Sequence, residues 1–330
     1  MKNLLKPVRA ILIGSGLSVL SMGLIGQTMA QKFPVKPVEW VVPYPAGGGT
    51  DVIARTLADG IQKRGNISFV VANKPGAATI IAADYVAKAK PDGYVVMSAD
   101  TATLAANEFL YSKLPYSPKK DFSDLGLICR FNLILVVNPK IPAKNLKEFI
   151  AWAKTQKEAI PYGSPGQGSP HHLATELFKA ETGLNLTHVP YKGAAPAIQD
   201  VVGGQIPFMF VDSAAGYGHI VAGTLRPIAL ANMKRISTLP DIQTFNEQGL
   251  KGFEAYAWQG LVGPAGLPET VSTLFNQELR AVLDSTMVKA KFQALGVEPM
   301  PSTIAEMTKY ADAERAKWGK LIKANNIKLD

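Results

Sequence analysis

The sequence predicts an α/β protein of two lobes, and three observations lead to this fold class. Short apolar runs alternate with amphipathic stretches of about ten to fifteen residues, a pattern typical of βαβ units and a parallel sheet. The length of 330 residues corresponds to about two domains, and 47% hydrophobic residues suffice for a sizeable core. The chain contains no flexible linker, so we expect ordered strands near 131–138 and 253–262 to cross between the lobes.

The first thirty residues have the three-part layout of a secretory signal peptide. Lys2, Lys6 and Arg9 form a basic start, residues 10–25 carry no charge, and residues 28–30 end in a small-x-small cleavage site. An uncleaved membrane anchor is the alternative, but the apolar run is shorter than the roughly 20 residues that span a bilayer. We therefore expect cleavage after Ala30 and a soluble, exported mature protein.

The first half of the mature chain alternates strands and helices along the sequence. Turn residues punctuate it, with 44–49 after the first strand and Pro91-Asp92-Gly93 after the second helix. The pattern predicts strands at 39–43, 68–73 and 94–98 and helices at 51–63 and 79–90.

The second half repeats this order and ends in helices. A long apolar strand at 128–138 leads into it, and we expect the C-terminal helices to pack back on the first lobe. The remaining predicted strands lie at 160–163, 186–190, 206–210, 226–231 and 256–262. The predicted helices lie at 145–157, 171–181, 195–202, 213–222, 268–284, 286–295 and 303–325.

Charge and cysteine content exclude several classes of function. The net charge of +9 is spread through the chain rather than gathered in a basic run, which argues against a nucleic-acid-binding protein. The single cysteine, Cys129, allows no intrachain disulfide, and its apolar surroundings indicate an inert buried thiol. A mild positive field favours anionic small molecules as ligands.

A first glycine-rich loop, Tyr44 to Asp51, joins the first strand to the first helix. Its three glycines allow a tight turn, and the following helix N-terminus offers free N–H groups to an anion. A dinucleotide fingerprint needs a third glycine where Val52 stands, and a phosphate-binding P-loop needs a lysine before Thr50. The alternative is a plain turn capped by Thr50 or Asp51.

A second glycine-rich loop, residues 162–172, joins a strand to a helix in the second half. Ser169 is placed as N-cap and Pro170 as the first helical residue. The pair His171-His172 suggests a metal site, but no Glu-x-x-His or second histidine pair supports it. A serine-hydrolase elbow around Ser164 lacks its first glycine, because Tyr162 occupies that position.

Three acidic residues, Asp51, Asp100 and Asp212, follow predicted strands. Ligands of open α/β sheets bind outside the carboxyl ends of the strands, so all three side chains could face the cleft between the lobes. Helix capping is the alternative for each, and nothing in the spacing places two of them within reach for acid–base catalysis. Lys192 also follows a strand and could steer an anion, although a surface position is the simpler interpretation.

A resemblance to a known family rests on several motifs in the same order. They are VEWVVPYPAGGGTDVIARTLA, NKPGA, PDGY, GSPGQGSPHHLATELF, HVPYKGAAPAIQDVVGGQI and GTLRPIALA. From about Phe33 to the C-terminus, the chain resembles the periplasmic receptors of tripartite tricarboxylate transporters, the Bug or TctC-like family.

The resemblance implies a two-lobe Venus-flytrap fold, with a mixed sheet flanked by helices in each lobe. Residues 31–133 and 257–330 are expected to form lobe 1, and residues 134–256 lobe 2. It also implies a small organic carboxylate held by the two glycine-rich loops, delivery to membrane transporter subunits, and a monomer without enzymatic activity, cofactor, metal or nucleic-acid partner. The site residues carried over by position are Tyr44, Ala46, Gly48, Thr50, Asp51, Asp100, Thr101, Ser164, Gly168, Ser169, His171 and Asp212.

Two hypotheses of different classes follow from the sequence. The first is a receptor that delivers its ligand to a transporter, and the second is a periplasmic enzyme or a ligand sensor on the same scaffold. Acidic residues at Asp100 and Asp212 disfavour a citrate-like polyanion and leave room for a ligand with a donor or amine group.

Overall fold

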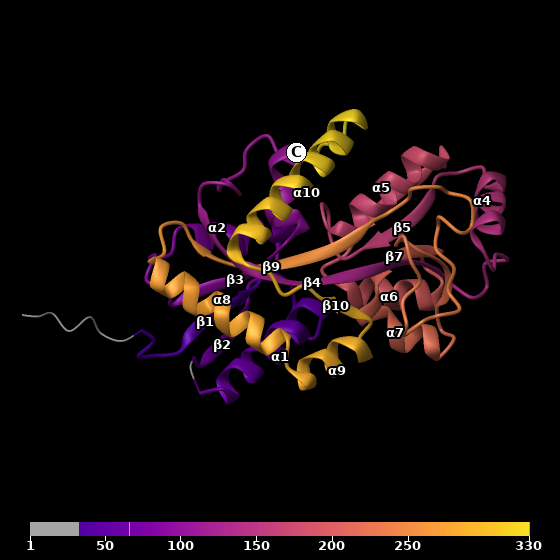
Figure 1. Ribbon diagram of the computed structural model, residues 1–330. Helices are drawn as coiled ribbons and strands as arrows, with labels where there is room; N and C mark the ends of the chain where they lie inside the picture. The colour runs from indigo at the N-terminus through magenta and orange to yellow at the C-terminus, as the bar shows by residue number, and fades with distance from the viewer. Residues whose placement is uncertain (1–32, 66, 330) are drawn as a thin grey trace, which may run out of the picture. The chain divides into compact units, whose positions relative to one another are not determined.

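The computed structural model describes residues 33–65 and 67–329, so the predicted signal peptide lies outside the described residues. From Pro34 onward the chain forms one compact unit, in which two lobes share the long strand β4 (Phe122–Val137) (Figure 1). Within this described part, no helix is both long and apolar enough to cross a membrane.

The first lobe is a sheet with strand order β2-β1-β3-β9-β4, and β10 adds to β4. Its parallel strands are β1 (Val38–Val42), β2 (Phe69–Asn73) and β3 (Val95–Asp100), and its antiparallel ones are β9 (Tyr256–Pro264), β10 (Val297–Pro299) and β4. The helices are α1 (Gly49–Lys63), α2 (Ile80–Ala87), α3 (Asn107–Leu110), α8 (Glu269–Leu283), α9 (Thr286–Ala294) and α10 (Ile304–Ala324).

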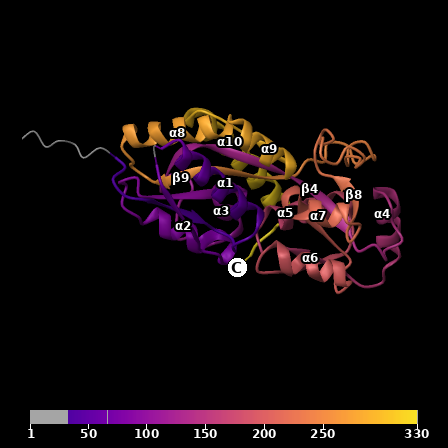
Figure 2. The same cartoon turned by 90° about the horizontal axis from the view of Figure 1, so that it is seen from below.

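The second lobe continues the sheet as β4-β7-β5-β6, with β8 also paired to β4. Its strands are β5 (Ile160–Ser164), β6 (Leu186–Pro190), β7 (Phe208–Asp212) and β8 (Arg226–Leu230). Its helices are α4 (Leu146–Thr155), α5 (Pro170–Thr182), α6 (Ala194–Gly203) and α7 (Ser213–Val221), and Figure 2 shows them grouped around β4 and β8, apart from α1, α2 and α8.

The strand β4 changes partner part-way along its length. Asn132 pairs with Tyr256 of β9, whereas the next residue, Leu133, pairs with Asp212 of β7. This change lies within one residue of the boundaries expected from the sequence, 133/134 and 256/257, which stay our proposal for where one lobe gives way to the other.

The C-terminal helices complete the core of the first lobe, as the sequence predicts. Trp258 of β9 and Trp318 of α10 are buried, and their indole N–H groups donate to Glu314 Oε2 at 3.1 and 3.0 Å. Burying these two rings removes a large apolar area from water, and the hydrogen bonds satisfy the carboxylate beside them. The helix α10 is thereby fixed to the sheet.

The strand β4 begins earlier than its apolar pattern predicts. Residues 122–127 contain polar and glycine positions, yet they pair with β9 because the C-terminal segments supply hydrogen-bond partners. Asn276 Nδ2 donates to the carbonyl of Leu125, and the amide of Leu127 donates to Ser302 Oγ. These long-range partners cannot be deduced from local periodicity.

One contact between the lobes involves the end of the chain. The amide of Leu329 donates to the carbonyl of Leu110 at 3.0 Å, and Gln167 Nε2 of the second lobe donates to the carbonyl of Leu329 at 3.4 Å. A Cβ atom at Gly168 would lie 3.2 Å from Leu329 Cδ1 and 3.4 Å from Ala78 Cβ. We call Ala78, Gln167, Gly168 and Leu329 the C-terminal seam.

Candidate functional site

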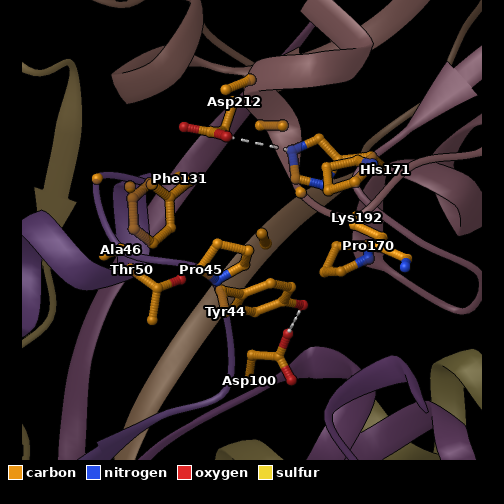
Figure 3. A pocket seen from close by; sticks show the side chains of 18 of the residues that line it. Tyr44, Pro45, Ala46, Thr50, Asp100, Phe131, Pro170, His171, Lys192 and Asp212 are labelled. Carbon is orange, nitrogen blue, oxygen red and sulfur yellow. Dashed lines mark hydrogen bonds and ion pairs between the residues drawn. The ribbon is translucent and has the colours of Figure 1, made fainter. Parts of the chain in front are cut away.

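A cavity of about 270 Å³ is lined by the first glycine loop (residues 44–51) and by loops of the second lobe (Figure 3). The figure shows Tyr44, Pro45 and Thr50 facing His171 and Asp212. The residues that line the cavity are Tyr44, Pro45, Ala46, Gly47, Gly48, Gly49, Thr50, Asp100, Phe131, Pro165, Pro170, His171, Lys192, Gly193, Ala194, Ala195, Pro196, Asp212, Ala257 and Gln259.

The first glycine loop presents the start of α1 to this cavity. Gly48 is the N-cap residue and no side chain caps the helix, so its first amide groups have no partner within the helix. Gly47 adopts a φ of +81°, which glycine reaches without steric cost. The uncapped helix start, with its positive dipole end, is suited to bind an anion.

Asp51 supports this loop from beneath and does not line the cavity. Its carboxylate accepts from the Gly47 amide at 2.9 Å, from Arg55 Nε at 3.0 Å and from Asn73 Nδ2 at 2.9 Å. Burial alone would raise the pKa of Asp51, but the hydrogen bonds from Arg55, Gly47 and Asn73 outweigh burial and lower it. Asp51 is therefore an ionised anchor that fixes the turn.

Thr50 and Gln259 form a buried polar pair at the cavity wall. Gln259 Nε2 donates to Thr50 Oγ1, which leaves the threonine hydroxyl hydrogen to donate to another acceptor. Gly49, which precedes Thr50, has no room for a side chain, because a Cβ atom would lie 3.2 Å from both Asp212 Oδ1 and Phe131 Cε1. The first loop thus meets the second lobe at close range.

Asp100 lies at the end of β3, where the Tyr44 hydroxyl donates to its Oδ2 at 2.6 Å. The amide and hydroxyl of Thr103 donate to Oδ1 at 2.9 and 3.0 Å. Burial nevertheless raises the pKa of Asp100, although these hydrogen bonds oppose the shift. The adjacent Thr101 lies behind the cavity wall, where its Oγ1 accepts from the Trp258 amide.

The second glycine loop (residues 162–172) is largely occupied with its own hydrogen bonds. Ser169 Oγ accepts from the amide of His172 at 3.3 Å and caps α5, and Pro170 follows as the first helical residue. The amide of Gly168 donates to His172 Nδ1 at 3.1 Å. Only Pro165, Pro170 and His171 of this loop line the cavity.

A stacked histidine pair lies beneath this loop. The rings of His172 and His188 are 3.9 Å apart between centroids, and Ser164 Oγ is 2.7 Å from His188 Nε2. Burial lowers the pKa of His172 to about 4 and that of His188 to about 3. The Ser164–His188 pair has the distance of a nucleophile and base, but Ser164 is fully buried, lies outside the cavity lining and hydrogen-bonds the carbonyl of Gly166. The pair therefore holds the loop in place.

His171 and Asp212 of the second lobe contact each other at the cavity wall. His171 Nε2 lies 3.3 Å from Asp212 Oδ2, and Asp212 Oδ1 accepts from the amide of Ala215 and caps α7. Each of these two side chains is 10% exposed.

The start of α6 is the second uncapped helix N-terminus on the cavity. Gly193 is its N-cap residue with a φ of +113°, no side chain caps the helix, and Ala194 and Ala195 line the cavity. Lys192 precedes it and also lines the cavity. One free helix start from each lobe, α1 and α6, therefore faces the same space.

Comparison with known proteins identifies the family. The profile described as "Tripartite tricarboxylate transporter family receptor" matches residues 53–327. The chain belongs to this receptor family. Protein BugT of Bordetella pertussis is 31% identical over 315 residues, which cover 95% of this chain and 97% of BugT.

Two solved structures of similar proteins show the same fold with ligands. One is "R. palustris Rpa4515 with adipate", with a TM-score of 0.87 and 34% identity, covering 90% of this chain and all of that one. The other is MatC (Rpa3494) from Rhodopseudomonas palustris with bound malate, with a TM-score of 0.83 and 29% identity, covering 88% and 100%. The resemblance and the two-lobe α/β fold expected from the sequence are confirmed.

The structure brings seven of the twelve residues carried over from the family to the lining of this cavity, and the other five lie outside that lining. Those that line it are Tyr44, Ala46, Gly48, Thr50, Asp100, His171 and Asp212. Those that do not are Asp51, Thr101, Ser164, Gly168 and Ser169. Whether any of the twelve touches a ligand stays a prediction.

Sequence reasoning missed several cavity residues. Gln259 and Phe131 lie within strands, where local periodicity indicates only burial. Lys192 is exposed, as the simpler interpretation of the sequence expects, and it also lines the cavity. The glycine that precedes α6 was an available signal, because it repeats the arrangement of a glycine before a helix start.

The part of the chain that the structure describes holds no group of three or more histidine, cysteine, aspartate or glutamate side chains suited to a metal ion.

Proposed function

We propose that this chain is an exported receptor that binds a small organic carboxylate between its lobes and delivers it to a membrane transporter of the tripartite tricarboxylate type. One observation carries the proposal: the uncapped N-termini of α1 and α6 face one cavity from different lobes. Free amides at a helix start, with the dipole behind them, bind carboxylates without a metal or an arginine.

The ligand contacts we propose are a subset of the residues expected from the sequence, with additions. The amides of Gly49 and Thr50 and those of Ala194 and Ala195 supply donors, and the Thr50 hydroxyl supplies one more. Adipate and malate, named for two similar receptors, are both carboxylates, which supports this ligand class. Asp51, Ser164 and Ser169 act by fixing the loops.

Binding to both lobes favours the closed arrangement over an open one. A ligand that contacts two lobes gains its full interaction energy only when they are together, so it shifts the population toward closure. We propose β4 near Asn132 and Leu133 as the hinge, because its pairing partner changes there.

Calorimetry on the mature chain, residues 31–330, tests this proposal. Mono- and dicarboxylates are titrated in turn, and the mixture is then analysed chemically. We expect saturable binding of at least one carboxylate, recovery of that ligand unchanged, and a smaller radius in small-angle scattering. An uncharged amide analogue of the bound carboxylate serves as the matched control and should bind at least about tenfold more weakly. Chemical turnover of the ligand would instead favour the enzyme hypothesis.

Export and assembly state are tested on the secreted protein. Intact-mass measurement should give a chain that begins at Gln31, and sedimentation should give a monomer. A mass that retains residues 1–30 would contradict the predicted cleavage after Ala30.

A further inference from the structure

Two buried carboxylates lie on the wall of the cavity in which we propose that a carboxylate binds. They are Asp100 at the end of β3 and Asp212 at the end of β7. Within residues 33–65 and 67–329, neither of them forms an ion pair with a lysine or an arginine. A third carboxylate in the same cavity adds like charge to a site of low dielectric, which disfavours the ionised form of the groups already there.

Asp212 stands beside groups that stabilise its negative charge. Its Oδ1 accepts from the Ala215 amide at the start of α7, where the helix dipole favours an anion. Its Oδ2 lies 3.3 Å from His171 Nε2, and an imidazole can carry a positive charge. An anion in the cavity therefore meets a partly compensated charge at Asp212.

The hydrogen-bond donors that the described chain offers to Asp100 are neutral. The Tyr44 hydroxyl donates to Oδ2 at 2.6 Å, and the amide and hydroxyl of Thr103 donate to Oδ1 at 2.9 and 3.0 Å. Burial raises the pKa of Asp100 against these bonds, and an anion in the cavity would raise it further. Asp100 is therefore the wall carboxylate best placed to take up a proton.

The other titratable side chains around Asp100 come from both lobes. They are Tyr44, Tyr116, His171, Lys192 and Asp212. Burial raises the pKa of both tyrosines, so they stay protonated and act as donors. Lys192 is exposed, and water therefore screens its charge. The pair of His171 and Asp212 is left as the rival site for a proton.

We propose that the receptor takes up a proton together with its carboxylate ligand and that Asp100 receives this proton. The proton comes from the solvent and forms an O–H bond at Oδ2, which then donates to the hydroxyl oxygen of Tyr44. The Tyr44 O–H rotates away from Asp100 and donates to the ligand in the cavity that both residues line. Protonation thus converts an acceptor on the cavity wall into a donor for an anion. This step rests on the proposed function, because it uses the same cavity.

Calorimetry on the mature chain with malate, glutarate and adipate tests the proposal. Each titration is run in phosphate and in Tris, because the observed heat changes with the buffer's heat of ionisation in proportion to the protons taken up. We expect uptake of up to about one proton per ligand near neutral pH, and an affinity that rises by up to about tenfold per pH unit as pH falls from about 8 to about 6.5. This window lies well above the ordinary pKa of a carboxyl group, so the ligand's own protonation contributes little.

Variants identify the proton site. Asp100→Asn keeps a neutral group that can donate to Tyr44, so it should bind without proton uptake and at least as tightly as the wild type at about pH 8. Tyr44→Phe removes the proposed donor and should lose about tenfold or more in affinity at about pH 6.5. The matched control is Asp124→Asn. Burial also raises the pKa of Asp124, which accepts from the Thr308 hydroxyl at 2.6 Å outside the cavity lining, so proton uptake should persist in this variant.

The outcomes separate this proposal from the proposed function. If carboxylates bind to the wild type without proton uptake, or if Asp100→Asn takes up protons like the wild type, the proposal is overturned and the carboxylate receptor stands. In the second case, loss of uptake in Asp212→Asn would assign the proton to the pair of His171 and Asp212. If no carboxylate binds to the folded chain, the proposed function fails and this proposal fails with it.

Discussion

The two glycine-rich loops look alike in sequence but do different work in the structure. The first leaves the start of α1 uncapped and lines the cavity from Tyr44 to Thr50. The second caps α5 with Ser169 and engages Gly168 with His172, so little of it reaches the cavity. A glycine-rich loop before a helix is available to an anion only where no side chain of the protein occupies the helix start.

The largest effect is expected at the close approach between the first loop and the second lobe. The variant Gly49→Val places a branched side chain against Asp212 Oδ1 and Phe131, which a Cβ atom alone would meet at 3.2 Å. Overpacking costs about 1–3 kcal/mol, so ligand affinity should fall by up to about 100-fold as closure is impeded. Calorimetry measures the loss.

Gly218→Ala is the matched control for this substitution. A Cβ atom at Gly218, within α7, meets no atom within 4 Å. Its affinity should equal that of the wild type. If Gly49→Val also binds normally, the first loop does not close on the second lobe.

The second loop should respond to acid. The pKa of His172 is about 4 in the fold, because burial lowers it below the ordinary value of 6.5. The unfolded chain then binds more protons between these values, so stability is fully present above about pH 6.5 and is lost as pH falls toward about 4. The loss amounts to about 3 kcal/mol in the free energy of unfolding.

Urea unfolding across this pH window measures the effect. His172→Gln, whose amide oxygen can still accept from Gly168, should flatten the profile, whereas His219→Gln outside both loops should not. An unchanged slope for His172→Gln would show that other groups cause the acid loss.

A pair of hydroxyl deletions sharpens the comparison between the loops. Thr50→Ala should weaken carboxylate binding by about tenfold or more, because its hydroxyl hydrogen is free for the ligand. Ser169→Ala should lower the free energy of unfolding by about 1 kcal/mol with little effect on affinity, because its hydroxyl caps α5. The effects of the two substitutions should add in the double variant, because one hydroxyl binds the ligand and the other caps a helix.

Ser285→Ala removes a comparable N-cap at α9, remote from the cavity, and is the control for Ser169→Ala. Each variant is studied by calorimetry and by urea unfolding. Equal losses of affinity in Thr50→Ala and Ser169→Ala would instead support the expectation from the sequence that both glycine-rich loops hold the carboxylate.

The smallest effect is expected at Asp100, beneath the first loop. Burial raises the pKa of this carboxyl, so its contribution favours the fold below the unfolded pKa and is lost as pH rises through the raised value. At pH 7 the free energy of unfolding of Asp100→Asn should therefore rise relative to that of the wild type. The gain should be smaller at pH 4, which is about the pKa of an unfolded aspartate. A difference that does not vary with pH in urea unfolding would refute this assignment.

The sequence predicted the order of strands and helices well, because periodicity and turn residues are local signals. It placed Ser169 and Pro170 at the start of α5 correctly. It was wrong about the start of α1, which it put at Asp51 with Thr50 or Asp51 as the cap, whereas the helix begins at Gly49 and has no side-chain cap. The sequence could not show which side chains at the start of a helix face a cavity. Asp51 turns toward Arg55 and Asn73 because β2 supplies the asparagine, a partner 22 residues away.

Local sequence patterns could not predict the residues on the far wall of the cavity, for the same reason. Gln259 is a single polar residue in a buried strand, and only the pairing of β9 with β3 and β4 brings it to Thr50. A lone glutamine in an otherwise apolar run was nevertheless a usable signal, because buried amides need partners.

The C-terminal seam makes this receptor suited to optical sensing. Gln167 is exposed and touches Leu329 of the other lobe, so a dye attached at Gln167→Cys changes its surroundings when the lobes part. The chain's only native cysteine, Cys129, is buried, and burial raises the pKa of its thiol, so labelling reagents react at the introduced position alone. Fluorescence at the seam would then report ligand concentration without any further change to the protein.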